Sequence, residues 1–589
     1  MRVHPHTTGG GLMGSRSWIS FVVAIFKKQR LKESNIQTNK GYRFGILSIL
    51  IIGIVLLLLL LPIVSAAAPV AQFTGTPING SSPLPVTFTD TSAGNPTGWA
   101  WYFGDETYTA PWTQVNASAG WTARTGFSSV AMPDGSIVLM GGSWNYSVGN
   151  KNDVWRSTDN GATWMLVNAS AGWTARIYHC SVAMPDGSIV LTGGSNASSG
   201  DKNDVWRSND YGATWMLVNA SAEWTARAQH RSVVMPDGSI VLMGGHDNSY
   251  NLKNDVWRSN DYGATWMLVN ASAGWTARRG FSSIAMPDGS IVLMGGYDNS
   301  YNLKNDVWRS TDNGATWTQV NASTGWTARR GFSSIAMPDG SIVLMGGYDS
   351  VSPYWYKNDM WRSTDNGATW TQVNASTGWT ARNDHSSVAM PDGSIVLMGG
   401  HDNSYNLKND VWWLMLAGSS AQNPTHTYTA AGTYSVALQA YNAGGYNNTR
   451  KISYITVTAL PVASFTGTPT SGTAPLTVSF TDTSTGTPST WNWLFGDNST
   501  STTQNPVHVY ATPGNYTVSL IIMNADGSNT TVRTDYITVN VPAPVADFTA
   551  NVTFGTAPLT STSLIYHRTV PPAGHGISAT RILRHLGRW

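Results

Sequence analysis

The stretch MPDGSIVLMGG, residues 132–142, recurs five more times along the chain, unchanged or with one substitution. Successive copies are 51 to 53 residues apart, and each is followed by a polar loop and by KNDVW or a close variant. In five of the six units the motif is followed, in order, by RS, a turn with Asp and Gly, the residues GATW, a short strand and NAS-x-x-WTAR. The copies begin at Met132, Met184, Met235, Met286, Met337 and Met390. A repeat of this length with several short strands is typical of a β-propeller, so we expect an all-β fold.

The first unit predicts four short strands, at residues 128–132, 136–140, 153–156 and 164–167. We name them A to D in chain order. The residues Pro133-Asp134-Gly135 join A to B, and Asp-Gly is the expected pair where a hairpin turn needs positive φ. Four antiparallel strands of this kind make one propeller blade.

The sixth unit contains strands A, B and C but breaks off at Trp412-Trp413 without strand D. The missing strand matches residues 112–115, which precede the first unit and are followed by Asn-Ala-Ser as in the other copies. Pairing of this segment with the last unit would close a ring, and closure leaves only short, protected edges. The sequence therefore predicts a six-bladed propeller of four-stranded antiparallel blades over residues 108–416.

The repeated unit resembles the repeats of two known families. An arginine before a Ser-rich strand, an apolar strand ending in Gly-Gly, and N-D-x-W resemble the kelch repeat in all six units. Residues 157–164, STDNGATW, and their four equivalents resemble the Asp-box of sialidases and related repeat proteins. The resemblance implies a structural turn, in which the aspartate accepts backbone N–H groups, the glycine takes positive φ and the tryptophan packs between blades.

The segment after the propeller resembles a PKD domain, an Ig-like β-sandwich of surface proteins. Residues 460–541 alternate apolar and polar residues and contain WNWLFGD at 491–497 and NPVHVY at 505–510. The same motifs occur split, as WAWYFGD at 99–105 and NPTHTY at 423–428, on either side of the propeller. We therefore expect a first PKD domain, residues 67–107 and 417–459, with the propeller inserted in one of its loops. A partial third copy at 542–560 precedes a tail, 561–589, that we expect to be unstructured.

The chain begins with a basic, polar segment over residues 1–43 and an apolar one over residues 44–66. We expect the first to stay in the cytoplasm and the second to be a signal peptide or a transmembrane anchor. Cys180 is the only cysteine, so no disulfide framework can form. The net charge of +2 provides no basic patch, which argues against a nucleic-acid partner. The remainder is expected to be extracellular or at the cell surface, anchored or secreted.

The strand order A to D places the B–C and D–A loops on one face of the ring. Because these loops are the longer and more variable ones, we expect the ligand there. The candidate ligand-binding residues are Arg124, Arg176, Arg227, Arg278, Arg329, Arg382, His246, Asp247, Tyr297, Asp298, Tyr348, Asp349, His401 and Asp402. Aromatic and acidic side chains around a shallow mouth suit a glycan or a protein partner, bound at several equivalent loops. The alternative is that each arginine bonds loop carbonyls while the tryptophan before it seals two blades.

No metal site and no cofactor are predicted, with Ca²⁺ at the Asp/Asn loops left open. Each unit also ends strand D with the sequon Asn-Ala-Ser, which accepts a glycan only in a cell that glycosylates asparagine. The predicted glycosylation sites are Asn116, Asn168, Asn219, Asn270, Asn321 and Asn374.

Catalysis is not expected from the sequence. Glycosidases need two facing carboxyl groups, whereas Glu223 is the only glutamate in the repeats and the nearly identical blades place few different groups around the ring. The predicted function is therefore binding or adhesion at the cell surface. Two alternatives stay open: a secreted propeller glycoside hydrolase, sialidase-like, or a lyase, and a purely structural component of a surface layer.

Overall fold

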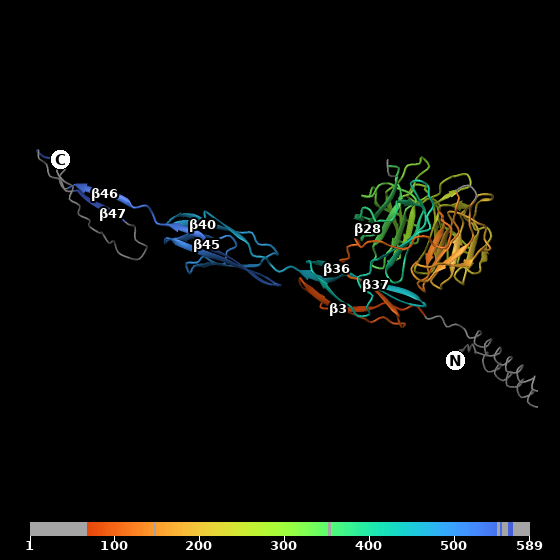
Figure 1. Ribbon diagram of the computed structural model, residues 1–589, viewed down its shortest axis with the longest axis horizontal. Coiled ribbons are helices and arrows are strands. Elements are labelled where there is room, and N and C mark those ends of the chain that lie inside the picture. The colour runs from red at the N-terminus through yellow and green to blue at the C-terminus, as the bar shows by residue number, and fades with distance from the viewer. Residues whose placement is uncertain (1–66, 146–148, 352–354, 551–553, 557–562, 569–589) are drawn as a thin grey trace, which may run out of the picture. The chain divides into compact units, whose positions relative to one another are not determined.

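The computed structural model describes residues 67–145, 149–351, 355–550, 554–556 and 563–568, and within these ranges it contains strands and loops but no α-helix (Figure 1). The all-β prediction is therefore confirmed for this part of the chain. No helix of the described ranges is long and apolar enough to cross a membrane. The segments predicted as cytoplasmic, residues 1–43, and as signal peptide or anchor, residues 44–66, lie outside the described residues.

Six four-stranded antiparallel sheets form the blades, with the first strand of each nearest the ring axis. Blades one and two are β6 (Ser128–Ala131), β7 (Ile137–Met140), β8 (Val154–Ser157), β9 (Met165–Asn168), and β10 (Cys180–Ala183), β11 (Ile189–Thr192), β14 (Val205–Ser208), β15 (Met216–Asn219). Blades three and four are β17 (Arg231–Val234), β18 (Ile240–Met243), β20 (Val256–Ser259), β21 (Met267–Asn270), and β22 (Ser282–Ala285), β23 (Ile291–Met294), β24 (Val307–Ser310), β25 (Thr318–Asn321). Blades five and six are β26 (Ser333–Ala336), β27 (Ile342–Tyr348), β28 (Tyr356–Ser363), β29 (Thr371–Asn374), and β31 (Ser386–Ala389), β32 (Ser394–Met398), β34 (Val411–Met415), β5 (Thr113–Asn116).

The sixth blade closes the ring with a strand from the other end of the propeller segment. Strand β5 pairs antiparallel with β34, and Val411 lies opposite Asn116 in the register. On the inner side, β31 of blade six contacts β6 of blade one, as each inner strand contacts the next. The prediction of six blades, completed by residues 112–115, is therefore confirmed.

Strand B of each blade is buried on both of its faces, which explains its unbroken run of apolar residues. In β7, Ile137 and Leu139 pack with Val396 of blade six, whereas Val138 and Met140 pack in a separate cluster with blade two. Successive side chains point to opposite faces of a strand, so one IVLM segment contributes to two interblade cores. The core therefore lies between the blades and is repeated around the ring.

The STDNGATW turn also joins neighbouring blades. Asp159 accepts hydrogen bonds from the backbone N–H of Thr163 at 2.8 Å and from its hydroxyl at 2.6 Å. Gly161 has a φ of 87°, and a Cβ there would fall 2.5 Å from a methyl group of Val411 in blade six. Only glycine therefore satisfies both the turn and the close packing.

Strands from the two sides of the propeller segment form one β-sandwich (Figure 1). Its sheets are β1 (Phe73–Thr76), β3 (Leu84–Asp90), β35 (Thr425–Tyr428), and β2 (Asn79–Ser81), β37 (Gly445–Thr458), β36 (Gly432–Asn442), β4 (Gly98–Tyr102). A second sandwich has the same strand order, with β38 (Phe465–Thr468), β40 (Leu476–Asp482), β43 (Val507–Tyr510), and β39 (Ser471–Thr473), β45 (Gly527–Asn540), β44 (Gly514–Asn524), β41 (Thr490–Leu494), β42 (Thr500–Ser501).

Part of the segment predicted to be an unstructured tail is ordered. Residues 563–568 form β47 (Ser563–Arg568), which pairs antiparallel with β46 (Val545–Ala550). The sequence SLIYHR contains β-branched and aromatic residues, which favour a strand once a partner strand is available. The prediction was wrong for these six residues.

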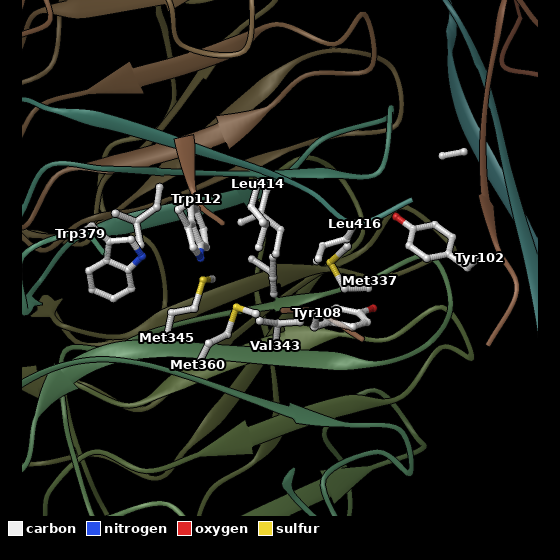
Figure 2. Close-up of a cluster of buried hydrophobic side chains, with 14 of the residues drawn as sticks. Tyr102, Tyr108, Trp112, Met337, Val343, Met345, Met360, Trp379, Leu414 and Leu416 are labelled. Atoms are coloured by element: carbon white, nitrogen blue, oxygen red, sulfur yellow. The ribbon is translucent and has the colours of Figure 1, made fainter. Parts of the chain in front are cut away.

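The first sandwich contacts the ring on the side of the PDG turns. Tyr102 donates a hydrogen bond to the carbonyl of Gly393 at 3.2 Å, and Gln439 donates one to the carbonyl of Pro391 at 2.8 Å. Tyr102 and Tyr108 belong to one buried cluster with Met337 and Leu416 (Figure 2). A hollow of about 390 Å³ at this end of the axis is lined by the Met-Pro pairs of the blades and by residues of the β36–β37 hairpin. The first sandwich thus covers the centre of this side of the ring.

Replacement of Trp112 tests the closure of the ring. Trp112 is 7% exposed and packs edge-on against Trp379, with ring centroids 6.3 Å apart (Figure 2). Because a buried tryptophan is deleted at the closing strand, Trp112→Ala should lower the free energy of unfolding of the ring by about 3–5 kcal/mol. Urea unfolding measures the change, and Trp144→Ala, at a side chain 49% exposed, is the control. Equal, small effects of both variants would contradict the role of residues 112–115.

Candidate functional site

The B–C and D–A loops meet on the face opposite the PDG turns, which we call the loop face. In each blade, the D–A loop that leads into strand A pairs with the B–C loop of the same blade. In blade three, for example, β16 (Arg227–Ala228) pairs with β19 (His246–Asp247). The pair β30 (Arg382–Asn383) and β33 (His401–Asp402) repeats this in blade six, and single bridges replace it in the other blades. Residues after the repeated arginine therefore lie beside residues after Gly-Gly.

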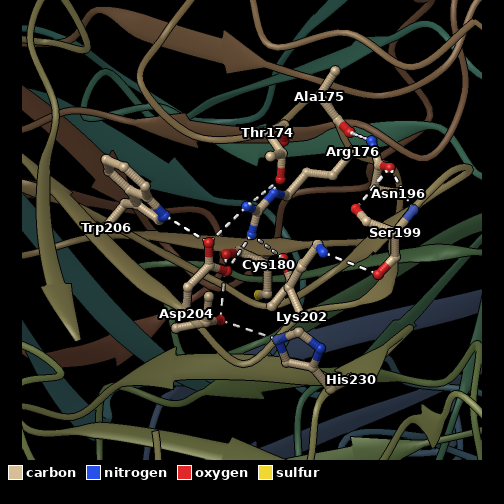
Figure 3. A network of polar contacts seen from close by, with 12 residues as sticks. Thr174, Ala175, Arg176, Cys180, Asn196, Ser199, Lys202, Asp204, Trp206 and His230 are labelled. Atoms are coloured by element: carbon tan, nitrogen blue, oxygen red, sulfur yellow. Dashed lines mark hydrogen bonds and ion pairs between the residues drawn. The ribbon is translucent and has the colours of Figure 1, made fainter. Parts of the chain in front are cut away.

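The six repeated arginines are buried rather than presented to a ligand, each 0–1% exposed. In blade two, Arg176 donates to both carboxylate oxygens of Asp204, at 2.6 and 2.8 Å, and to the carbonyl of Gly193 at 2.9 Å (Figure 3). The corresponding pairs are Arg124–Asp153, Arg227–Asp255, Arg278–Asp306, Arg329–Asp359 and Arg382–Asp410. The expectation that these arginines contact a ligand is corrected: each ties its D–A loop to strand C.

The aspartates after Gly-Gly hold their own loops. Asp298 accepts the backbone N–H groups of Ser300 and Asn302, at 2.9 and 3.0 Å, and pairs with Lys304 at 2.7 Å. Burial raises the pKa of Asp298, but Lys304 and Asn302 outweigh it and the pKa falls to about 2. The equivalent pairs are Asp247–Lys253, Asp349–Lys357 and Asp402–Lys408. These carboxylates are thus already bound within their loops.

The two candidate histidines are also engaged. His246 is 7% exposed and stacks on Tyr250, with ring centroids 5.3 Å apart. Burial, followed by the charge of Arg279, lowers the pKa of His246 to about 4, so it is neutral at pH 7. His401 lies 3.0 Å from the hydroxyl of Tyr356. Within the described ranges no three His, Cys, Asp or Glu side chains are grouped to hold a metal ion, and Ca²⁺ binding stays untested.

The tips of the D–A loops form a ring around the axis, which we call the loop-tip ring. Its six members all have positive φ, from 51° to 64°. Five N–H groups donate to the carbonyl of a neighbouring tip, at 2.8 to 3.3 Å. The members are Gly126, Tyr178, Gln229, Gly280, Gly331 and Asp384. These hydrogen bonds hold the backbone of the tips in equivalent positions, while the side chains differ between blades.

Two members of the loop-tip ring meet across it. The hydroxyl of Tyr178 donates to Oδ2 of Asp384 at 3.2 Å, although the two residues belong to blades two and six. A Cβ at Gly331 would fall 2.7 Å from Oδ1 of Asp384, so glycine leaves room for this carboxylate. Both side chains are partly exposed. They form an acidic and phenolic pair at the centre of the loop face.

Asp201 is a second distinctive carboxyl group, and only its place in a variable loop distinguishes it in the sequence. It lies in β13 (Gly200–Asp201), which pairs with β12 (Ser195–Asn196). Burial raises the pKa of Asp201, and the nearby charge of Asp247 adds to this effect. Its Oδ2 is buried without a hydrogen-bond partner. Such a carboxyl group is disposed to carry a proton.

Arg279 and Arg330, which follow the repeated arginines of blades four and five, were not among the residues predicted from the sequence. Each lies over two tyrosine rings, 4.9 to 5.2 Å from their centroids. Together with two of the predicted residues, Tyr297 and Tyr348, they line a hollow of about 550 Å³ that also includes Tyr301 and Asn302. The sequence does distinguish these two arginines, because the other four units have different residues at this position: Thr125, Ile177, Ala228 and Asn383.

The sequon asparagines connect neighbouring blades. Asn168 donates a hydrogen bond to the carbonyl of Ala213 at 2.8 Å, and its Oδ1 accepts the N–H of Ser170 at 2.9 Å. Bonds of the first kind also link Asn116–Ala162, Asn219–Ala264, Asn270–Ala315 and Asn321–Ala368. The repeated sequon therefore has a structural role, and its glycosylation stays a prediction.

Comparison with known proteins identifies one domain and several distant relatives. Residues 458–539 match the family model of the PKD domain. A xyloglucanase of Paenibacillus sp is 23% identical over 304 residues, which cover 44% of this chain and 28% of the relative. A xyloglucanase of Hypocrea jecorina is 23% identical over 326 residues, which cover 49% of this chain and 37% of the relative. An F-box/kelch-repeat protein of Arabidopsis thaliana is 24% identical over 217 residues, which cover 33% of this chain and 45% of the relative. The chain thus spans less than two fifths of the length of these two xyloglucanases.

Two solved structures resemble the chain at low sequence identity. The structure of YjhT is 14% identical with a TM-score of 0.43, and the match covers 52% of this chain and 99% of YjhT. A fungal alcohol oxidase in complex with copper is 13% identical with a TM-score of 0.37, and the match covers 73% of this chain and 99% of the oxidase.

The relatives correct one expectation from the sequence. We expected a protein without catalytic activity, because the blades are nearly identical and glutamate is almost absent from them. Several relatives are instead named xyloglucanase, a glycoside hydrolase, at identities of 23 to 24%, and they point to an enzyme. Near-identity of the blades was a weak argument against catalysis, because loop-face residues such as Asp201 and Asp384 differ between blades without any change in the repeat itself.

Two adjacent arginines provide a test of the buried ion pairs. Arg278→Ala leaves Asp306 without its partner in a buried setting, so the free energy of unfolding should fall by about 3–5 kcal/mol. Arg279→Ala removes contacts with tyrosine rings and a charge near Asp201 and His246 but no ion pair, and should cost about 1 kcal/mol. Urea unfolding followed by tryptophan fluorescence measures both. Equal losses would show that the buried arginine is not what holds the loop.

The lowered pKa of Asp298 predicts a pH-dependent contribution to stability. Its folded value of about 2 lies below the value near 3.9 of an unfolded chain, so the stabilisation is present above about pH 4. It is lost as the pH falls through the folded value. The difference in free energy of unfolding between wild type and Asp298→Asn should therefore shrink between about pH 4 and pH 2. A difference that stays constant down to pH 2 would contradict the assignment.

Proposed function

We propose that the chain is an extracellular glycoside hydrolase that binds a polysaccharide on the loop face of its propeller. The observation that carries the proposal is the pair of inequivalent carboxyl groups there, Asp201 and Asp384, which break the symmetry of otherwise repeated blades. Hydrolysis of a glycosidic bond needs two carboxyl groups with different protonation states. The xyloglucanase relatives support this reaction class, and the PKD domain supports an extracellular location.

Asp201 is suited to the role of general acid. Burial raises its pKa and the charge of Asp247 raises it further, so the proton is retained to a higher pH than in an ordinary aspartate. In the reaction this proton passes to the leaving glycosidic oxygen as the bond to the anomeric carbon breaks. Oδ2 makes no hydrogen bond to the protein but is itself buried, so the β12–β13 hairpin would have to move for it to reach the sugar oxygen.

Asp384 is suited to the second role. It is partly exposed at the loop-tip ring, and Tyr178 orients its Oδ2 through the 3.2 Å hydrogen bond. In one course of the reaction it accepts a proton from the attacking water, and in the other it attacks the anomeric carbon itself. The backbone bridge between Ile177 and Ser195 links the loop of Tyr178 to the strand that pairs with Asp201.

Aromatic side chains next to these groups would bind the polymer. Tyr250 and Tyr301 on the B–C loops are 68% and 76% exposed. Exposed aromatic rings on a rigid scaffold stack against the apolar faces of sugar rings. Adhesion to a surface glycan, the function predicted from the sequence, uses this same binding step.

Release of reducing ends from xyloglucan and from a panel of other polysaccharides tests the proposal with the full chain. Asp201→Asn and Asp384→Asn should each lower kcat by about 10²–10⁴. Asp201→Asn should also remove the alkaline limb of the pH profile, because the amide has no proton to lose. The control is Asp237→Asn, in a PDG turn on the opposite face, where the side chain is 49% exposed.

Two outcomes would overturn the proposal. One is a folded chain that releases no reducing ends from any polysaccharide above a heat-denatured sample. The other is unchanged activity in both aspartate variants. The configuration of the released anomeric centre then distinguishes the two courses of reaction.

A further inference from the structure

We propose that Arg279 and Arg330 bind the carboxylate of an acidic sugar, so that the glycan recognised by this protein contains uronic acid residues. The inference rests on the proposed function only in taking the loop face as the place where a glycan binds. It adds the charge of the ligand and the residues that select it.

The two arginines alternate with three tyrosines, and we call this set the arginine–tyrosine ladder. Arg279 lies 5.2 Å from the ring centroid of Tyr250 and 5.0 Å from that of Tyr297. Arg330 lies 5.0 Å from Tyr297 and 4.9 Å from Tyr348. The ladder runs along the B–C loops of blades three, four and five. The rings fix both guanidinium groups beside one hollow of about 550 Å³.

These guanidinium groups differ from other stacked arginines of the ring in having no carboxylate partner. Arg207 lies 3.8 Å from the ring centroid of Tyr262 and is paired with Asp186 at 2.5 Å. Arg362 stacks on a tyrosine in the same way and pairs with Asp339 at 2.6 Å. In the part of the chain that the structure describes, neither Arg279 nor Arg330 forms an ion pair. Two positive charges thus line the hollow without a direct ion-pair partner, and the charge of Arg279 acts on Asp201 only from a distance.

The hydrogen-bond donors of the pair are also largely unused. Nε of Arg279 is buried and has no hydrogen-bond partner. Because Nε is buried, an anion in the hollow would be bound through the terminal Nη groups. A guanidinium group presents its N–H donors in a planar fork that matches the two oxygens of a carboxylate. Each of the two arginines, on neighbouring blades, can bind a carboxylate in this way.

The remaining lining of the hollow favours a sugar as the carrier of the carboxylate. Tyr301, which is 76% exposed, presents ring surface for the C–H groups of a pyranose, and Asn302 supplies polar groups for its hydroxyls. Gly331 follows Arg330 in the chain and borders the carboxylate of Asp384. An acidic sugar held by the ladder would therefore lead the polymer towards the loop-tip ring.

The charge responsible is local to this hollow. The whole chain carries a net charge of only +2, so attraction of an acidic polymer by the general charge of the protein is weak. The arginine after the repeated arginine occurs in two adjacent units of the six. Selection of an acidic sugar would thus come from two blades and not from the ring as a whole.

Calorimetric titration of the full chain with trigalacturonate and with its methyl ester tests the inference, because the two ligands differ only in the charged group. We expect the acid to bind at least 10-fold more tightly than the ester. Arg279→Gln and Arg330→Gln should each weaken binding of the acid by about 10- to 100-fold and leave the ester unchanged. Arg207→Gln, at a stacked arginine of the opposite face, should change neither. Binding of the acid should also weaken as salt is raised.

Equal affinity for acid and ester, or unchanged affinity in both arginine variants, would overturn the inference. So would displacement of trigalacturonate by sulfate at equal concentration, because the site would then accept any anion. These outcomes are separate from those for hydrolysis. A chain that cleaves neutral polysaccharides but ignores the acid loses only this inference, and a chain that binds the acid without cleaving any polymer loses only the proposed function.

Discussion

The structure depends on one interaction that is repeated in every blade, the buried pair between the arginine of the D–A loop and the aspartate that begins strand C. In blade one, Arg124 is fully buried and reaches Asp153 with two hydrogen bonds of 2.7 and 2.8 Å. The same guanidinium bonds the carbonyl of Gly141, at the end of strand B. One side chain thus fixes the loop, the strand end and the next strand relative to one another. A buried charge that loses its partner is strongly destabilising, so the arrangement tolerates little variation.

This constraint explains why the loop face can carry function. Because the repeated arginine fixes each D–A loop, the next two residues occupy equivalent positions in all blades and can change without loss of the fold. The first of these positions carries Arg279 and Arg330 in two blades, and the second carries Tyr178 and Asp384 in two others. The propeller therefore supplies a constant frame, and differences among the blades at these two positions make the loop face asymmetric.

Much of the fold could be predicted from the sequence because its causes are periodic. The 51-residue step, the apolar run of strand B and the lone strand around Trp112 determine the number of blades and their closure. The roles of the side chains in the loops could not be read in the same way. Arg382 looks like a surface cation in the sequence, and its burial depends on Asp410, 28 residues later. The stacking of Arg330 on Tyr348 likewise depends on two loops that only the folded blade brings together.

The two ends of the axis are not equivalent, and this asymmetry decides where a polymer can act. At the PDG side the β36–β37 hairpin contributes Gln439 and Tyr446 to the lining of the central hollow, so that end is covered by the protein's own chain. At the other side backbone hydrogen bonds link the loop tips, and exposed side chains such as Tyr250 and Tyr301 belong to the surrounding B–C loops. A long polysaccharide would lie across this side and not across the side that the sandwich covers. A site built there can therefore recognise internal segments of a polymer, for which neighbouring loops provide a succession of contacts.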